Sequence, residues 1–212
     1  MRYVDPDGMA PYDIIIDGDA DFKKQALEAL QQLTSETLAL DDDGKVIITG
    51  CSGTDNCPTG SDLVSDLVNS DKNVFIRKGS GYNRTQPWNK KGQIREDGTP
   101  NEGTNSTIFW VPNERESGAD EDGNSETEPF IILGHELGHA RELAEGIGDN
   151  SPTNPRIIDP DGSETILEKD EYRNRKFENN IRSEQNEPLR ITGPNRKAEF
   201  LLFNFWLTPP KN

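Results

Sequence analysis

The only two histidines of this 212-residue chain lie four residues apart, in the segment His135-Glu136-Leu137-Gly138-His139. On an α-helix, this spacing places both imidazoles on one face, about one turn apart, with Glu136 beside the space between them. Two neutral imidazoles and a carboxylate are typical ligands of a catalytic zinc ion, which keeps a further position for water. The segment therefore predicts a helix with a zinc site, in which His135 and His139 are ligands and Glu136 is the general base for hydrolysis of a peptide bond.

The alternative interpretation of this segment is an ordinary amphipathic helix with two surface histidines. Two histidines placed at random would show this spacing, with glutamate directly after the first, on the order of once in a thousand sequences. The apolar run Phe130 to Leu133 lies directly upstream, so we expect a mostly interior helix, where polar groups without partners are costly. We expect the helix to begin at a capping box of Ser125 and Glu128, with Pro129 in its first turn, and to stop at Gly146.

A third zinc ligand has to come from elsewhere, and because the chain has no third histidine, a carboxylate is the remaining choice. This excludes the version of the motif in which HExxH is followed by xxGxxH. A second helix is expected to begin near Ser163 and to carry the ligand. The candidates are the downstream glutamates Glu164, Glu168, Glu171 and Glu178. We favour Glu171, with Glu168 as the second choice.

Two further features would serve a peptide substrate. Zinc peptidases hold an extended substrate along an edge strand, and the predicted strand Ser106 to Val111 is the candidate for it, against the alternative of a plain sheet strand. Tyr172 and Arg173, next to the favoured ligand, are candidates for stabilising an oxyanion, against the alternative of exposed helix residues. The polar stretch from Gly79 to Asn105, which contains Trp88, is expected to be a long functional or mobile loop.

The rest of the chain alternates short apolar runs with turn-rich segments, which favours an α+β fold with a small mixed sheet. The further predicted elements are an apolar run at Ile14–Ile16, a helix over Phe22–Leu40 capped by Asp19 or Asp21, strands at Val46–Thr49 and Val74–Arg77, a short helix over Asp62–Val68, and an apolar C-terminal stretch, AEFLLFNFWL, packed beneath the active-site helices. We expect one catalytic domain, residues 14–212, after a lead-in over residues 1–13.

The charge balance restricts the partners of the chain. The formal net charge of −16 repels phosphate backbones, so we expect no nucleic-acid partner. No apolar run reaches the roughly 18 residues that span a bilayer, and no charged-then-apolar leader opens the chain, which predicts a soluble protein without a membrane span. We expect a monomer. Cys51 and Cys57, the only cysteines, are expected either to bridge a small loop or to remain free thiols.

Four segments resemble the bacterial effector metallopeptidase family that includes NleD, within residues 47–190. They are GTDNCPTGSDLVSDLVNSDKNVFI, GTNSTIFW, PFIILGHELGHARELAEG and DEYRNRKFENNIRSEQNEPLR. The resemblance implies a zincin-like fold, zinc as the cofactor, and cleavage of proteins inside a target cell. It carries His135, Glu136 and His139 over directly. A downstream glutamate carries over less directly, because the segment EYRNRKFEN is prone to insertions.

The opening segment RYVDPDGMAP is similar to the end of the core of Rhs or YD-repeat proteins, the shell that precedes variable C-terminal toxin domains. This similarity implies that the chain is the toxin tip of a larger bacterial protein, which is secreted and delivered into a target cell. A cognate immunity protein is then a candidate partner. The alternatives are a non-catalytic binding module derived from a peptidase and a zinc hydrolase with a non-protein substrate, because HExxH defines the water-activating chemistry better than the substrate.

Overall fold

The computed structural model describes residues 13–51, 56–115, 118, 120–152, 157–158 and 164–190. The helices in these segments are α1 (Ala20–Leu33), α2 (Pro58–Val68), the 3-10 helix η1 (Lys90–Gly92), α3 (Pro129–Glu145) and α4 (Lys169–Glu184). The strands are β1 (Ile14–Asp17), β2 (Glu36–Leu40), β3 (Val46–Cys51), β4 (Val74–Lys78), β5 (Arg84–Pro87), β6 (Ser106–Trp110), β7 (Ile157–Ile158) and β8 (Glu164–Thr165). Among the described residues, no helix is both long and apolar enough to cross a membrane.

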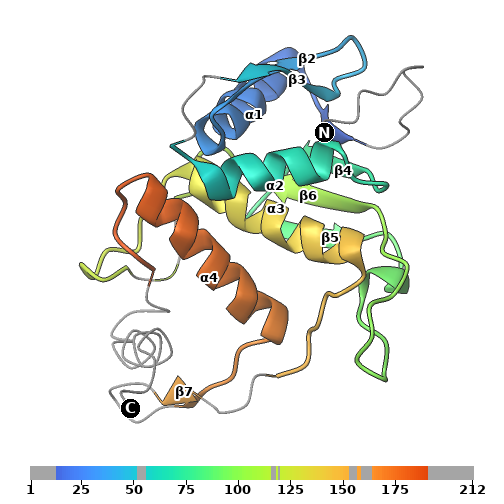
Figure 1. The fold of residues 1–212 in the computed structure, drawn as a ribbon. Helices are drawn as coiled ribbons and strands as arrows, with labels where there is room; N and C mark the ends of the chain where they lie inside the picture. Colours follow the sequence, from blue (N-terminus) through green and yellow to red (C-terminus); the bar gives the residue numbers. More distant parts are fainter. Residues whose placement is uncertain are drawn as a thin grey trace, which may run out of the picture.

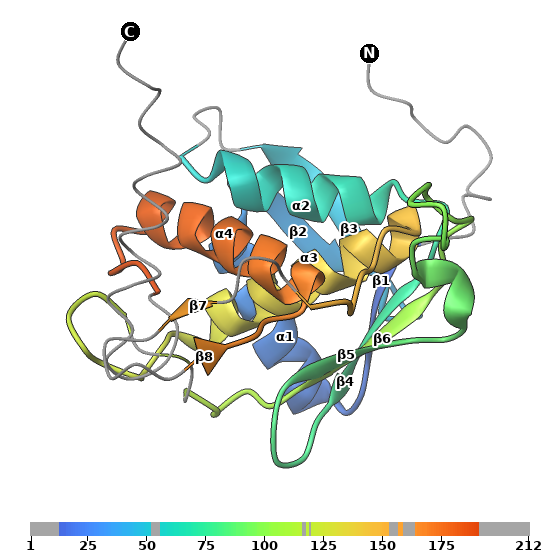
Figure 2. The same ribbon diagram turned by 90° about the horizontal axis from the view of Figure 1, so that it is seen from below.

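A mixed four-stranded sheet forms one layer of the fold, and the helices form the other (Figure 1). The strand order is β1-β4-β6-β5, in which β1, β4 and β6 are parallel and β5 runs antiparallel to β6 at the edge. Strands β2 and β3 make a separate antiparallel pair, as do β7 and β8. Helix α3 contacts β5 and β6 of the sheet as well as α1, α2 and α4 (Figure 2). This confirms the predicted α+β architecture with small sheets.

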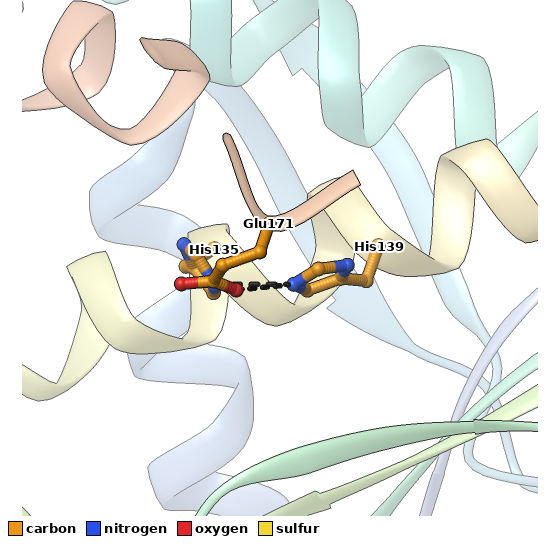
Figure 3. Close-up of side chains that lie close together, drawn as sticks. All are labelled: His135, His139 and Glu171. Atoms are coloured by element: carbon orange, nitrogen blue, oxygen red, sulfur yellow. Dashed lines mark hydrogen bonds and ion pairs between the residues drawn. The ribbon is translucent and has the colours of Figure 1, made fainter. Parts of the chain in front are cut away.

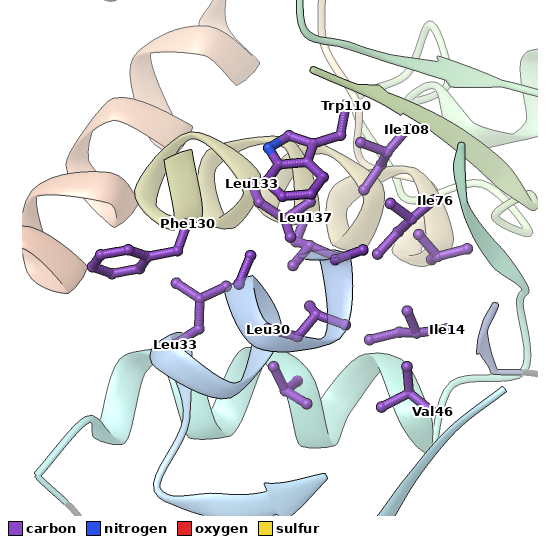
Figure 4. Close-up of a cluster of buried hydrophobic side chains, with 14 of the residues drawn as sticks. Ile14, Leu30, Leu33, Val46, Ile76, Ile108, Trp110, Phe130, Leu133 and Leu137 are labelled. Carbon is purple, nitrogen blue, oxygen red and sulfur yellow. The ribbon is translucent and has the colours of Figure 1, made fainter. Parts of the chain in front are cut away.

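The hydrophobic core lies between this sheet and helices α1 and α3 (Figure 4). Alternate residues of the parallel strands point toward the helices, so Ile14, Ile76 and Ile108 are fully buried. Leu30 of α1 and Leu133 of α3 meet them from the helix side. Burial of each such side chain contributes roughly 1.5–3 kcal/mol. The core therefore holds the histidine-bearing helix against the sheet.

Helix α1 is shorter than its apolar spacing predicts. The predicted helix over Phe22–Leu40 is right as far as Leu33 and wrong beyond it. At Thr34 the backbone becomes extended, and the Thr34 hydroxyl accepts a hydrogen bond from the backbone N–H of Glu36 at 3.0 Å. Such a local bond from a side chain to the backbone competes with helix continuation. Leu38 is buried from strand β2 instead, where pairing with β3 satisfies the backbone.

The stretch from Gly79 to Asn105 is not one long loop, because it contains β5 and η1. Trp88 follows β5 and stacks on Phe75 of β4, with 5.2 Å between ring centroids. Strand β5, with the sequence RTQP, has no apolar alternation to reveal it. Because β5 pairs with β6, the predicted edge strand Ser106–Val111 is an interior strand.

Helix α3 begins and ends close to the predicted positions, but the predicted capping box is wrong. Glu128 is itself the cap residue, with no side-chain hydrogen bond to the helix, so Ser125 and Glu128 do not cap each other. The Glu128 carboxylate instead pairs with Arg115 Nη1 at 2.6 Å. Pro129 occupies the first turn, and Gly146 ends the helix with a left-handed backbone (φ 72°), both as predicted.

Several shorter predictions are confirmed. They are the Asp19 cap of α1, the strands Val46–Thr49 and Val74–Arg77, and the helix Asp62–Val68, which begins earlier at Pro58. Cys51 and Cys57 are not joined by a disulfide, so the predicted alternative of two thiols holds. The opening residues 1–12 and the C-terminal stretch AEFLLFNFWL lie outside the described residues.

Candidate metal centre

The two histidines meet one glutamate where α4 packs against α3 (Figure 3). His135 and His139 lie one turn apart on α3, and Glu171 lies in the first turn of α4, which begins at Lys169 rather than near Ser163. His135 Nε2 and His139 Nε2 are 3.2 Å apart, and each is 3.3 Å from Glu171 Oε2. The three atoms therefore form a nearly equilateral triangle.

This triangle has the size that a tetrahedral zinc site requires. Zinc lies about 2.0–2.1 Å from nitrogen and oxygen ligands, so neighbouring ligand atoms of a tetrahedral site are about 3.3 Å apart. The observed separations are 3.2 and 3.3 Å. Among the described residues, His135, His139 and Glu171 form the group of potential metal ligands whose ligand atoms lie close enough together to hold one ion. The donor set fits zinc and leaves a fourth position for water.

The charges within the triangle are strongly coupled. Burial of the His135 ring disfavours its protonated form, but the carboxylates of Glu171 and Glu178 outweigh this effect and raise the pKa of His135 to about 10. Burial likewise acts to raise the pKa of Glu171, yet His135 and His139 lower that pKa well below its usual range. In the metal-free protein, a proton therefore supplies positive charge at this position, and a bound cation would take its place.

Glu178 contacts His135 from outside the triangle. Its Oε2 lies 3.0 Å from His135 Nδ1, the ring nitrogen that does not face Glu171. Arg182 Nε and Arg190 Nη1 donate to the Glu178 carboxylate at 2.8 and 2.7 Å. Burial acts to raise the pKa of Glu178. The positive charges of Arg190, His135 and Arg182 outweigh this effect and lower the pKa. A charged carboxylate on the outer nitrogen of a ligand imidazole fixes the orientation of the ring.

Among the alternative third ligands whose side chains the structure describes, neither Glu168 nor Glu178 completes the triangle. Glu178 takes the outer position just described. Glu168 is the cap residue of α4 and is exposed at the cleft, where burial and the neighbouring carboxylates raise its pKa. The side chain of Glu164 lies outside the part that the structure describes. Of the four candidates, the structure thus brings Glu171 to the two imidazoles.

Asn174 occupies the corresponding outer position at His139. Its side-chain amide lies 3.1 Å from His139 Nδ1 and donates to a backbone carbonyl of α4 at 3.1 Å. A Cβ atom at Gly138 would lie 2.1 Å from Asn174 Oδ1, so the glycine leaves room for this amide. Sequence reasoning missed Asn174 and the outer position of Glu178. Helical spacing could have indicated both residues, because Asn174 and Glu178 lie three and seven positions after Glu171 and so share its face of the helix.

Glu136 lies beside the triangle in an open cleft. Its side chain is mostly buried, and its Oε2 accepts a hydrogen bond from Thr85 Oγ1 of β5 at 2.7 Å. Two cavities of about 380 and 280 Å³ adjoin at this point, and His135, Glu136 and Glu171 line both of them. The first cavity extends toward Tyr82, before β5, and the second includes Thr85. A water molecule and a substrate therefore have access to the triangle and to Glu136.

Tyr172 and Arg173 are not among the residues that line this cleft. Arg173 donates to both carboxylate oxygens of Glu142, at 2.7 and 2.8 Å, and to the carbonyl of Ile147 at 3.0 Å. The ring of Tyr172 lies 4.4 Å from the ammonium group of Lys176. Both side chains are thus directed to other partners, and these contacts give no support to the predicted oxyanion role of either residue.

The fold and the site together define an α+β protein with a His-His-Glu candidate metal centre in a cleft beside a sheet edge. Residues 10–192 match the Peptidase_M91 family, which is described as "Effector protein". This match covers most of the chain, so the protein belongs to this family of peptidase effectors. A comparison with curated proteins finds no match.

Proposed function

We propose that this protein is a zinc-dependent endopeptidase of zincin-like fold that hydrolyses peptide bonds in proteins of a target cell. His135, His139 and Glu171 are the proposed zinc ligands, and Glu136 is the proposed general base. The observation that carries the proposal is the triangle of ligand atoms, 3.2–3.3 Å on each side, next to Glu136 in an open cleft. Membership of a family of peptidase effectors supports a peptide bond as the substrate.

The chemistry divides between the metal and the residues around it. Zinc, when bound, supplies Lewis-acid chemistry, since it lowers the pKa of a water molecule to about 7 and polarises a carbonyl group. The Glu136 carboxylate takes the proton of the attacking water and delivers it to the leaving amine. Arg175 Nε donates to Glu171 Oε1 at 2.7 Å, which leaves Oε2 directed at the histidines.

Among the described strands, β5 pairs with β6 alone, and its other edge is the surface along which we expect an extended peptide to bind. Trp88 N donates to Asn105 O in continuation of the β5–β6 pair, at 2.9 Å. Hydrogen-bonded and non-hydrogen-bonded pairs alternate in antiparallel strands. The backbone groups of Thr85 and Pro87 therefore face outward. Pro87 has no N–H to pair, which is compatible with an edge position.

The proposed biological setting follows from the family and from the opening segment. An effector peptidase acts after delivery into a target cell, and the similarity of RYVDPDGMAP to the end of an Rhs core supports a larger secreted toxin as the carrier. A cognate immunity protein in the producing cell would then be a partner of this chain. We propose that the peptidase acts as a monomer.

Replacement of Glu136 by glutamine tests the proposed mechanism. Glu136→Gln is expected to retain stoichiometric zinc but to cleave at least about 100-fold more slowly, because the ligands remain while the base is lost. Zinc is measured by mass spectrometry of the purified protein. Cleavage is measured on a proteome-derived peptide library by identifying new termini, with chelator-treated wild type as the negative control. Normal turnover by the variant would refute the role of Glu136.

The same measurements separate the alternative functions. A wild-type protein that takes up no zinc, even when zinc is in excess, would support a non-catalytic binding module. A protein that holds stoichiometric zinc but cleaves no peptide of the library would support a hydrolase with a non-protein substrate. An anomalous-scattering peak bonded to His135, His139 and Glu171 would identify the metal and its third ligand in one experiment.

A further inference from the structure

Thr85 is the residue of the edge strand whose side chain reaches the proposed base. It pairs with Ile108 of β6, whose side chain is buried on the helix-covered face of the sheet, so the Thr85 side chain lies on the same face and is directed toward α3. Thr85 Oγ1 is 2.7 Å from Glu136 Oε2 and 3.0 Å from the backbone oxygen of Glu136. Thr85 is not one of the three candidate metal ligands.

The Thr85 hydroxyl donates its hydrogen bond to the Glu136 carboxylate rather than to the backbone oxygen of Glu136. A hydroxyl donates a single proton, and the carboxylate is both closer and charged, which makes it the stronger acceptor. The backbone oxygen of Glu136 lies within α3, where the helix supplies its own N–H partner four residues later. Within the part of the chain that the structure describes, Thr85 is the hydrogen-bond partner of the Glu136 carboxylate.

We propose that Thr85 is a positioning residue that holds the Glu136 carboxylate toward the space beside the metal triangle. This inference rests on the proposed function of Glu136 as the general base. A glutamate side chain has three rotatable bonds, so a carboxylate without this partner samples orientations from which it cannot take the proton of the water. Loss of the Thr85 hydroxyl should slow the chemical step without weakening substrate or zinc binding, because the backbone groups of β5 and the metal ligands are unchanged.

The test compares Thr85→Val, which keeps the shape of the side chain but lacks the hydroxyl, with Thr85→Ser, which keeps the hydroxyl. The reporter is the peptide that wild type cleaves best in the library. Thr85→Val is expected to retain stoichiometric zinc, to lose about 10–100-fold in kcat, and to keep KM within about twofold. Thr85→Ser is expected to remain within about threefold of the wild-type kcat. Thr49→Val, which removes a strand hydroxyl in the separate β2–β3 pair, serves as the control and should leave kcat unchanged.

Three kinetic results would overturn the inference. They are an unchanged kcat in Thr85→Val, an equal loss in Thr85→Ser and Thr85→Val, and a rise in KM at constant kcat. A wild type that cleaves no peptide overturns the proposed function instead, and crystal structures then decide the role of Thr85. One ordered Glu136 carboxylate at Thr85 in wild type, with several orientations in Thr85→Val, would support the inference. The same single orientation in both proteins would overturn it.

Discussion

The orientation of the two imidazoles depends on side chains that lie outside the triangle of candidate ligand atoms. Glu178 contacts Nδ1 of His135, and Asn174 contacts Nδ1 of His139. Both come from α4, the helix that also carries Glu171. A metal-binding imidazole carries its proton on the outer nitrogen, so a partner there sets the tautomer and direction of the ring when it accepts a hydrogen bond from that nitrogen. The Glu178 carboxylate can do so at His135, and the Asn174 amide does so at His139 when its oxygen faces Nδ1. Loss of such partners typically costs about 10–100-fold in metal affinity. Helix α4 thus supplies the candidate ligand Glu171 and a contact to the outer nitrogen of each candidate histidine ligand.

Replacement of Gly138 by alanine tests whether Asn174 supports His139, because it adds a single carbon atom beside the Asn174 amide. Gly138→Ala places a Cβ 2.1 Å from Asn174 Oδ1, so the amide has to move away from His139. We expect zinc affinity, measured by competition with a chromophoric chelator, to fall by about 10–100-fold. In an Asn174→Ala background the conflict with the amide is absent and the next contact of the Cβ, Phe177 Cδ1, lies at 3.3 Å, so the further effect of Gly138→Ala should be small. Wild-type zinc affinity in the Gly138→Ala single variant would contradict the proposed support of His139.

At the scale of elements, helix α4 is attached to its surroundings by a buried cluster of charges. Glu178 and Arg182 are 2% and 1% exposed, so neither charge is solvated by water. Arg182 also donates to the carbonyl of Pro188 at 3.0 Å and to the Thr127 hydroxyl at 2.5 Å. These bonds connect α4 to the segments before α3 and after α4. The position of Glu171 relative to the histidines therefore depends on a network that begins at Glu178.

Removal of Glu178 should destabilise the whole domain as well as the metal site. Glu178→Ala leaves the buried guanidinium of Arg182 without its carboxylate, and breaking a buried pair in this way costs about 3–5 kcal/mol. The free energy of unfolding is measured by urea denaturation of the zinc-free protein. Glu28→Ala, which removes a mostly exposed carboxylate beside Lys24, is the control and should change stability little. A Glu178→Ala variant as stable as the control would show that the cluster does not anchor α4.

At the scale of the whole molecule, the proposed metal joins two helices that are more than twenty residues apart in the sequence. Two proposed ligands lie on α3, and the third lies on α4. A ligand that binds the folded state alone adds free energy of unfolding according to its concentration and affinity. Zinc binding should therefore stabilise the domain by adding metal–ligand bonds between α3 and α4, which already pack together.

This stabilisation is measurable by calorimetry. Free zinc at about 100 times its Kd contributes about 2.7 kcal/mol, which corresponds to a rise in Tm of roughly 5–10 °C for a domain of this size. Treatment with a chelator should reverse the rise. Glu171→Ala should show little of it, whereas Glu168→Ala, which alters a neighbouring carboxylate outside the triangle, should show it in full. An equal rise in wild type and Glu171→Ala would exclude Glu171 as a ligand.

Local patterns along the chain predict the features that depend on neighbouring residues. The spacing of His135 and His139 puts both rings on one helical face, Pro129 and Gly146 delimit that helix, and the apolar runs at Val46 and Val74 form strands. These features follow from the periodicity of local backbone structure, which a short window of sequence contains. The same local patterns predict a helix that continues past Leu33 and a loop in place of β5, and the structure shows neither. In both places, pairing with a distant strand decided the conformation.

The packing of separate elements determines which distant groups share the site. Four glutamates were compatible with the sequence, but the packing of α4 on α3 brings Glu171 to the triangle and Glu178 to the outer nitrogen of His135. The pairing of β5 with β6 moved the sheet edge away from the predicted strand and placed Thr85 on Glu136. The physical reason is that such contacts depend on the relative positions of separate elements. Those positions are set by the common core and by buried charges rather than by spacing along the chain.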